Sequence, residues 1–206
     1  MTIDKNDLLN SILASISRID YVKSSDIPNI DLYMDQVTTF MEKELKSTKR
    51  YEDDKILTKT MINNYAKNDL LPPPVKKKYS KEHLMILTFI YYFKSILSIG
   101  DIEKLLSPIT EKFFDSDKDI DISRIYDEVC SADKARTDIL QEDIKAAFAS
   151  SKYTFSDVND EDDKELLQYF SFICMLSLDV YVKKQLIEKL IDASTESKSN
   201  DKKNKK

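Results

Sequence analysis

A single glycine, Gly100, occurs in the 206 residues of this chain, together with five prolines. Glycine lets the backbone pass close to a phosphate, so Rossmann and P-loop nucleotide sites depend on several glycines in one short loop. The composition therefore excludes those two classes of nucleotide-binding fold. Turn-rich all-β folds also need Gly and Pro at their many tight turns. We expect an all-α chain, or a mainly α chain with a small β-wing.

Charge is distributed unevenly along the chain, whose net charge is -5. Basic and acidic residues nearly balance from Met1 to Thr110, and the acidic excess lies in the remainder. Between Lys55 and Lys81 there are seven lysines and one acid, Asp69. A local positive patch of this size is typical of a surface that binds phosphate, although a solvated lysine-rich loop has the same composition.

Cysteine and histidine are scarce. Cys130 and Cys174 stand far apart, and the N-terminus has no signal-peptide pattern, which fits reduced thiols in a cytoplasmic protein. His83 is the only histidine, so the sequence lacks the ligands of a zinc site and the partners of a Ser-His-Asp triad. We therefore expect no metal, no cofactor and no enzymatic activity.

Apolar residues recur at helical spacing along most of the sequence. Helices are expected at 7–19, 31–45, 59–68, 80–97, 98 to just before Pro108, 122–129 and 139–148, with a polar loop at 46–55 and an extended segment at 75–79. Thr58, Ser80 and Ser98 are suitable N-cap residues for the helices that follow them.

A long helical stretch at 165–191 contains the run LLQYFSFICMLSLDVYV. Polar residues such as Gln168 and Asp179 interrupt this run, so it falls short of the roughly 18 uninterrupted apolar residues of a membrane-spanning helix. We expect a buried core helix or a dimerisation face, and no membrane contact. The charged tail at 194–206 is expected to be disordered.

The helix at 59–68 carries a polar stripe made of Thr60, Asn63, Asn64 and Lys67, at spacing i, i+3, i+4 and i+7. Asn and Thr are poor helix formers, but an asparagine amide can pair with an adenine edge and a threonine methyl can contact thymine. Lys59 and Lys67 would then hold phosphates. A merely polar helix face is the alternative interpretation.

The segment that follows leaves helical geometry at Leu70-Leu71-Pro72-Pro73-Pro74, because a residue before a proline is pushed toward extended backbone. Lys76, Lys77 and Lys78 then form a basic wing. Side chains alternate along an extended strand, so we expect two of these lysines to reach a phosphate backbone.

The strings TMINNYAKNDLLPP, KYSKEHLMILTFI and LSIGDIEKLL together resemble the winged helix-turn-helix of MerR-type regulators, most closely at Tyr65, Leu70, Leu71, Pro72, Tyr79 and Ile102 to Leu106. The longer segment 27–108 is similar to the bacterial domain-of-unknown-function 1836 family, whose members are assigned to regulators by the same likeness. The resemblance implies a recognition helix at 58–68 in the major groove and a wing at 75–79, and it adds Tyr65 and Tyr79 to the expected contacts.

The sequence departs from the MerR pattern in three places. Asn63 and Asn64 replace the usual Arg-Tyr pair, and the connection at 46–55 is longer than the three or four residues of a typical helix-turn-helix. Pro108 is expected to stop the helix that MerR proteins extend for dimerisation, so the mode of dimerisation stays open.

Taken together, these patterns predict an N-terminal helix (1–25), a MerR-like DNA-binding domain (26–108), a helical dimerisation or effector region (109–193) and a tail (194–206). We expect a transcriptional regulator that binds double-stranded DNA, as a homodimer and under a small-molecule or protein effector. The alternative is a protein-interaction module on the same scaffold. The residues expected to contact DNA are Lys59, Thr60, Asn63, Asn64, Tyr65, Lys67, Lys76, Lys77, Lys78 and Tyr79.

Overall fold

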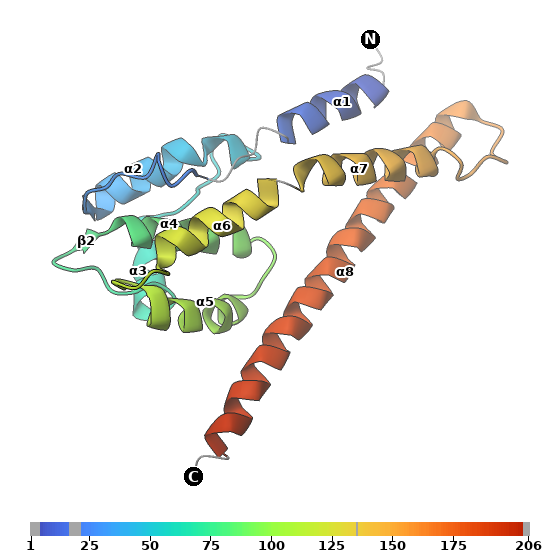
Figure 1. The fold of residues 1–206 in the computed structure, drawn as a ribbon. Coiled ribbons are helices and arrows are strands. Elements are labelled where there is room, and N and C mark those ends of the chain that lie inside the picture. The colour runs from blue at the N-terminus through green and yellow to red at the C-terminus, as the bar shows by residue number, and fades with distance from the viewer. Residues whose placement is uncertain (1–4, 17–21, 135, 204–206) are drawn as a thin grey trace. The chain divides into compact units, whose positions relative to one another are not determined.

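The computed structural model describes residues 5–16, 22–134 and 136–203. The chain divides into two compact units, Met1–Lys134 and Ala135–Lys206. The fold is mainly helical with one small sheet, as the composition predicts (Figure 1). The division after Lys134 differs from the predicted domain boundary at 108.

The elements of the first unit are α1 (Lys5–Ile16), β1 (Leu32–Tyr33), α2 (Met34–Glu44), a 3-10 turn η1 (Lys46–Thr48), α3 (Lys59–Lys67), β2 (Lys78–Tyr79), α4 (Lys81–Phe93), α5 (Ile99–Phe113) and α6 (Ile122–Lys134). The second unit holds α7 (Thr137–Ser151) and α8 (Glu161–Lys203). Every predicted helix is present. The last three residues predicted for the first helix lie outside the described residues.

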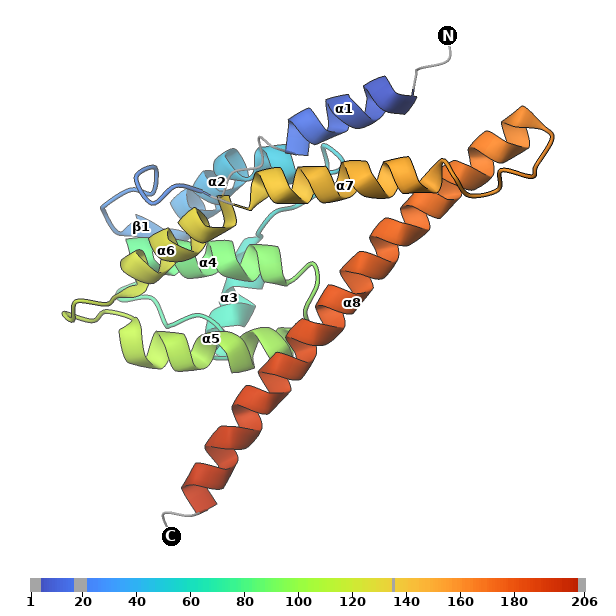
Figure 2. The same cartoon turned by 45° about the vertical axis from the view of Figure 1, so that its right-hand side comes forward.

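Helix α4 is the centre of the first unit, since all eight residues from His83 to Ile90 are buried. Helices α2 and α6 and strand β2 pack against it (Figure 2). The Tyr126 ring of α6 lies 5.2 Å from that of Phe89, and its hydroxyl donates to the Val22 carbonyl. This packing places α6 in the same core as α4, which is why the unit extends past residue 108.

The sheet joins two segments far apart in sequence: β1 and β2 run antiparallel, with Leu32 opposite Tyr79 and Tyr33 opposite Lys78. Strand β1 falls within the helix predicted at 31–45, because a two-residue strand has no periodicity of its own. Tyr33 ends the strand and caps α2, and its backbone N–H donates to the Gln36 side chain at 2.9 Å.

The prediction that Pro108 ends its helix is wrong. Helix α5 continues through Pro108 to Phe113, although an interior proline removes one backbone hydrogen bond at a cost of about 3 kcal/mol. Packing on both sides of the proline offsets that cost: Leu106 is buried before it, and Phe114, directly after the helix, sets its ring 4.7 Å from that of His83.

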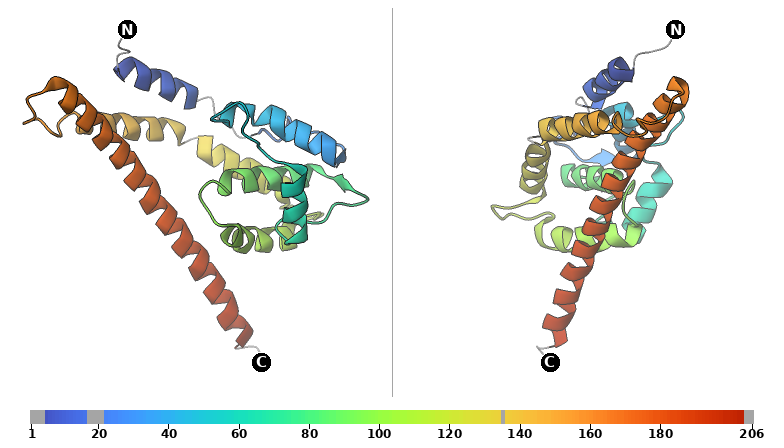
Figure 3. Two further views of the ribbon diagram at one scale, coloured as in Figure 1. Left: turned by 180° about the vertical axis from the view of Figure 1, so that it is seen from behind. Right: turned by 90° about the vertical axis from the view of Figure 1, so that its right-hand side faces the viewer.

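In the second unit, α7 and α8 cross where the Phe148 and Phe172 rings meet at 5.1 Å, and they diverge beyond that point (Figure 3). Gln168 fixes the intervening loop by donating to the carbonyls of Lys152 and Thr154, at 2.8 and 3.0 Å.

Helix α8 is not the buried core helix that sequence analysis allowed. Many of its large apolar side chains are exposed, among them Leu166, Phe170, Leu178 and Val180. By length and composition alone, Glu161–Ser194 is also apolar enough to cross a bilayer. The helix continues through Lys203, so the tail predicted to be disordered is helical at 194–203, and its residues 204–206 lie outside the described residues.

Candidate nucleic-acid interface

Helix α3 begins where the sequence predicts. The Thr58 hydroxyl accepts the Met61 backbone N–H at 3.2 Å, as an N-cap should. Ile62 and Tyr65 anchor the inner side of the helix and are almost fully buried. The opposite side of α3 is therefore held outward by packing.

The four side chains of the polar stripe, Thr60, Asn63, Asn64 and Lys67, are all exposed. Within the part of the chain that the structure describes, the side-chain amides of Asn63 and Asn64 have no hydrogen-bond partner; the Asn68 amide donates to the Asn64 backbone carbonyl instead, at 2.8 Å. Two adjacent exposed amides are thus available to a partner outside the chain.

Lys59 stands at the first turn of α3 and forms an ion pair with Asp35 of α2. Both side chains are more than half exposed, so the pair is weak. An acid in this position was not foreseen by sequence analysis, and it reduces the charge that Lys59 can offer to a phosphate.

Tyr65 serves the fold rather than the surface. It is 7% exposed, burial raises the pKa of its phenol, and its carbonyl accepts the N–H groups of Leu70 and Leu71 at 2.9 and 3.2 Å. Asp69, with φ of 56°, turns the chain out of the helix. We therefore remove Tyr65 from the contacts expected with DNA.

The basic wing is a tight turn rather than an extended strand. Val75 and Lys78 exchange both backbone hydrogen bonds, at 3.1 and 2.9 Å. Lys76 and Lys77 form the tip between them, with φ of 50° and 65°. Positive φ at both central residues is the geometry of a type I′ turn, which favours Asn and Gly. Each lysine there costs about 1–2 kcal/mol relative to right-handed backbone.

The base of the wing is fixed by the sheet. Tyr79 is 3% exposed and pairs with Leu32, so it is also removed from the expected contacts. The Lys78 ammonium lies 5.3 Å from the centre of the Tyr33 ring, whose side chain is exposed. The wing therefore presents Lys76 and Lys77 at its tip and a Lys78–Tyr33 pair at its base. Tyr33 could not be found from sequence, since it joins the wing only through the sheet.

His83 packs beneath the wing. Its ring lies edge-on to Tyr79 and Phe114, and its Nδ1 accepts the Ser80 backbone N–H at 3.0 Å. Burial lowers the pKa of this imidazole, so the neutral form is favoured. The role of His83 here is to cap α4.

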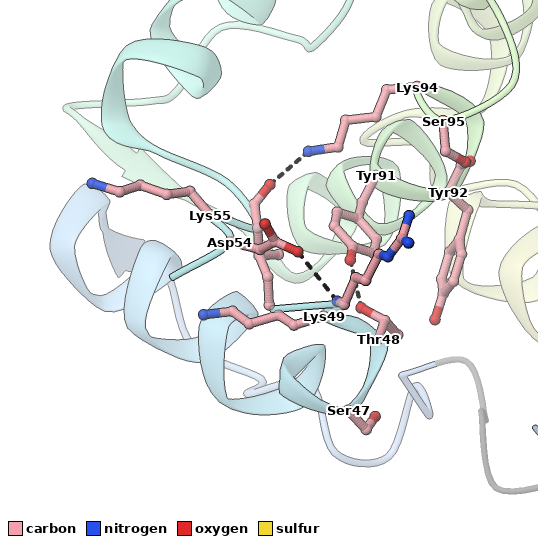
Figure 4. A pocket seen from close by; sticks show the side chains of 11 residues that line it. Ser47, Thr48, Lys49, Asp54, Lys55, Tyr91, Tyr92, Lys94 and Ser95 are labelled. Atoms are coloured by element: carbon pink, nitrogen blue, oxygen red, sulfur yellow. Dashed lines mark hydrogen bonds between the residues drawn. The ribbon is translucent and has the colours of Figure 1, made fainter. Parts of the chain in front are cut away.

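A cavity of about 640 Å³ lies between residues 47–56, which connect α2 to α3, and the end of α4 (Figure 4). The Lys94 ammonium donates to the Ile56 carbonyl at 2.6 Å and lies 4.8 Å from the Tyr91 ring. Burial lowers the pKa of Lys94. The cavity lining also holds Arg50 and Lys55, one carboxylate, Asp54, and Lys49, which is paired with Glu42. The remaining positive charge suits a small anion. Among the described residues, no group of three His, Cys, Asp or Glu side chains could hold a metal.

The model of one protein family, described as a domain of unknown function (DUF1836), matches residues 22–129. The chain belongs to this family. The match runs from before β1 into α6 and so includes α3, the wing and the cavity. Comparison with the curated proteins and with the solved structures finds no match. The family description assigns no activity.

Proposed function

We propose that this protein is a sequence-specific DNA-binding transcriptional regulator with a MerR-like winged helix-turn-helix. In this proposal α3 enters the major groove and the wing contacts the phosphate backbone beside it. Asn63 and Asn64 read bases, while Lys67, Lys76 and Lys77 hold phosphates.

The observation that carries the proposal is the tip of the wing. Two adjacent lysines occupy left-handed backbone where Asn-Gly would be more stable. Backbone strain of this kind concentrates at functional sites. Both side chains are exposed, so burial does not explain why lysine stands at these positions. In this proposal, lysine is kept there for its positive charge, despite the cost to the backbone.

The exposed asparagines support the same proposal. A solvent-facing stripe usually stabilises its helix with Glu, Lys and Ala, whereas three of the four residues in the α3 stripe are poor helix formers. Paired amides are the groups that recognise adenine, so the preferred operator would be rich in A·T.

The test begins with selection of bound fragments from a genomic library, followed by fluorescence anisotropy on the enriched duplex at several salt concentrations. Lys76→Ala/Lys77→Ala/Lys78→Ala should weaken binding to every duplex. Asn63→Ala/Asn64→Ala should reduce the preference for the enriched duplex over a scrambled one. The matched control removes three exposed lysines from other helices and loops, Lys112, Lys118 and Lys145, and should leave affinity almost unchanged.

A protein-interaction module on the same scaffold is the second candidate, favoured by the net charge of -5 and by the Lys59–Asp35 pair. It predicts weak binding that is indifferent to duplex sequence, together with a stoichiometric protein partner in a pull-down that is lost in Asn63→Ala/Asn64→Ala. Enrichment of one duplex sequence would exclude it as the main function.

We further propose that the cavity beside Lys94 receives the effector, a small anion with an apolar body that contacts Tyr91. It borders the long connection between α2 and α3, so an occupant would bias the position of α3. Thermal-shift titration with inorganic phosphate and with a nucleoside monophosphate tests this. Any shift should disappear in Lys94→Gln and persist in Lys43→Gln, which changes an exposed lysine on α2; no shift with either probe would count against the cavity.

A further inference from the structure

Helix α8 carries a regular stripe of positions that are exposed except at its last member, Lys184, which is half-buried. Leu166, Phe170, Ile173, Ser177, Val180 and Lys184 follow one another at alternating steps of four and three residues. This spacing is the heptad pattern by which two helices pack together. The four apolar members are 63%, 60%, 44% and 57% exposed, in chain order, so the stripe lies in solvent although its pattern is that of a buried seam.

The other side of α8 already has its partner in the unit. Phe172 is 6% exposed and packs against Phe148 of α7. Successive residues of an α-helix are about 100° apart, so Phe172 points about 200° away from Phe170. Asp179 is the single charge between Glu165 and Lys183, and it also lies off the stripe. The stripe is therefore a second apolar surface, distinct from the one that α7 covers.

The two ends of this surface carry opposite charge. Glu161, Asp162, Asp163 and Glu165 precede it together with one lysine, Lys164. Lys183, Lys184 and Lys189 lie at its far end together with one acid, Glu188. A second copy in the same direction would place acid beside acid and lysine beside lysine. A copy in the opposite direction would place each acidic end beside a lysine end. The charge pattern therefore selects antiparallel self-pairing.

We propose that two copies of this chain associate through α8 in an antiparallel pair whose two-fold axis crosses the seam midway between the levels of Ile173 and Ser177. This register sets Phe170 opposite Val180 of the second copy, and Ile173 opposite Ser177 of the second copy. Each large side chain thus meets a smaller one, as close packing requires. Leu166 meets the aliphatic part of Lys184 of the second copy, whose ammonium reaches the acidic end.

The register makes a geometric prediction about Cys174, which is exposed. Cys174 lies one residue after Ile173 and next to the axis, so it faces Cys174 of the second copy across the seam. In a parallel pair the two thiols would lie on opposite sides of the seam. A short thiol-to-thiol crosslinker therefore reports the direction of pairing.

The inference does not depend on nucleic-acid binding, and its test contains no DNA. In a Cys130→Ala background, light scattering should give the mass of two chains, and a bismaleimide with a spacer of roughly 8 Å should join them through Cys174. Phe170→Asp/Ile173→Asp should give the mass of one chain and lower the crosslink yield at least about tenfold. Leu178→Asp is the matched control, because Leu178 is 63% exposed but lies off the stripe; it should leave both readings unchanged.

Charge reversal tests the direction separately. Lys183→Glu/Lys184→Glu should lower the dimer fraction at low salt, and adding Asp162→Lys/Glu165→Lys in the same chain should restore it. In a parallel pair the combined reversal would restore nothing, and salt would strengthen the wild-type dimer. A monomer at all concentrations, a crosslink that survives Phe170→Asp/Ile173→Asp, or co-sedimentation with phosphatidylcholine vesicles that Phe170→Asp abolishes would each overturn the proposal, the last in favour of a membrane.

Discussion

Replacing the two lysines at the tip of the wing should stabilise the protein and weaken its binding to DNA at the same time. The perturbation is Lys76→Asn/Lys77→Gly, which gives the tip at φ of 50° and 65° the sequence that a type I′ turn prefers. The backbone stays left-handed, but Asn and Gly occupy it without most of the cost of about 1–2 kcal/mol that each lysine bears there. Glycine returns about 0.5–1 kcal/mol of that gain through the entropy of the unfolded chain. The free energy of unfolding should therefore rise by about 1–3.5 kcal/mol.

The same substitution removes two positive charges from the proposed phosphate contacts. Each contact contributes about 0.9 to the slope of log K against log salt concentration, so the slope should fall by about 1.8 in magnitude. At physiological salt this corresponds to roughly a 30-fold loss of affinity. Urea unfolding followed by circular dichroism measures the first effect, and anisotropy on the selected duplex measures the second.

Lys76→Arg/Lys77→Arg is the matched control, because it keeps both the charge and the unfavourable backbone. It should change neither stability nor the salt slope. If the Asn-Gly variant is no more stable than the wild type, the reasoning about backbone strain is wrong. If that variant binds as tightly as the wild type, the tip does not contact phosphate.

Three further predictions concern the core that supports the interface. Burial lowers the pKa of His83, so as pH falls below about 6.5 the unfolded chain binds a proton before the folded chain does. The free energy of unfolding should then fall by at most about 1.4 kcal/mol per pH unit. In His83→Gln, the free energy of unfolding should depend less on pH between about pH 6.5 and 5. Tyr126→Phe leaves the buried Val22 carbonyl without the Tyr126 donor, so urea unfolding should show a loss of about 1–3 kcal/mol, and a loss below 0.3 kcal/mol would contradict the bond. Pro108→Ala restores a backbone donor inside α5 and should raise the melting temperature, with a gain of about 2 kcal/mol; a lower melting temperature would show that the proline ring itself packs in the core.

Much of the architecture could be predicted because it rests on local signals. Helical periodicity located each helix, and Thr58 marked the start of α3 through the hydrogen bond that its hydroxyl then makes. The stripe on α3 was identified for the same reason, since Ile62 and Tyr65 fix which side of the helix faces inward.

The errors arose where distant residues decide local structure. Strand β1 exists because Leu32 pairs with Tyr79, and α5 passes Pro108 because packing on either side outweighs one missing hydrogen bond. Tyr65 and Tyr79 matched a family pattern at positions that are conspicuous in sequence, yet both are buried. The residue type alone does not show whether a tyrosine is buried beneath a surface or exposed on it.

The shape of the wing was also beyond local reasoning. Three lysines in a row indicate a charged segment, and extended backbone is the ordinary expectation for residues that follow prolines. The turn forms because Val75 and Lys78 exchange two hydrogen bonds and β2 is held by β1. Those constraints place Lys76 and Lys77, rather than alternate lysines, at the tip.

The salt dependence of duplex binding by the wild type and by Lys76→Ala/Lys77→Ala/Lys78→Ala tests the central claim most directly. If the wing and α3 hold a duplex, the wild type should show a linear decline of log K with log salt concentration. The variant should then show a slope smaller in magnitude by about 2–3 on the same duplex. Equal slopes for the two proteins would contradict this claim. So would the absence of wild-type binding at about 50 mM salt, where electrostatic attraction to DNA is strong.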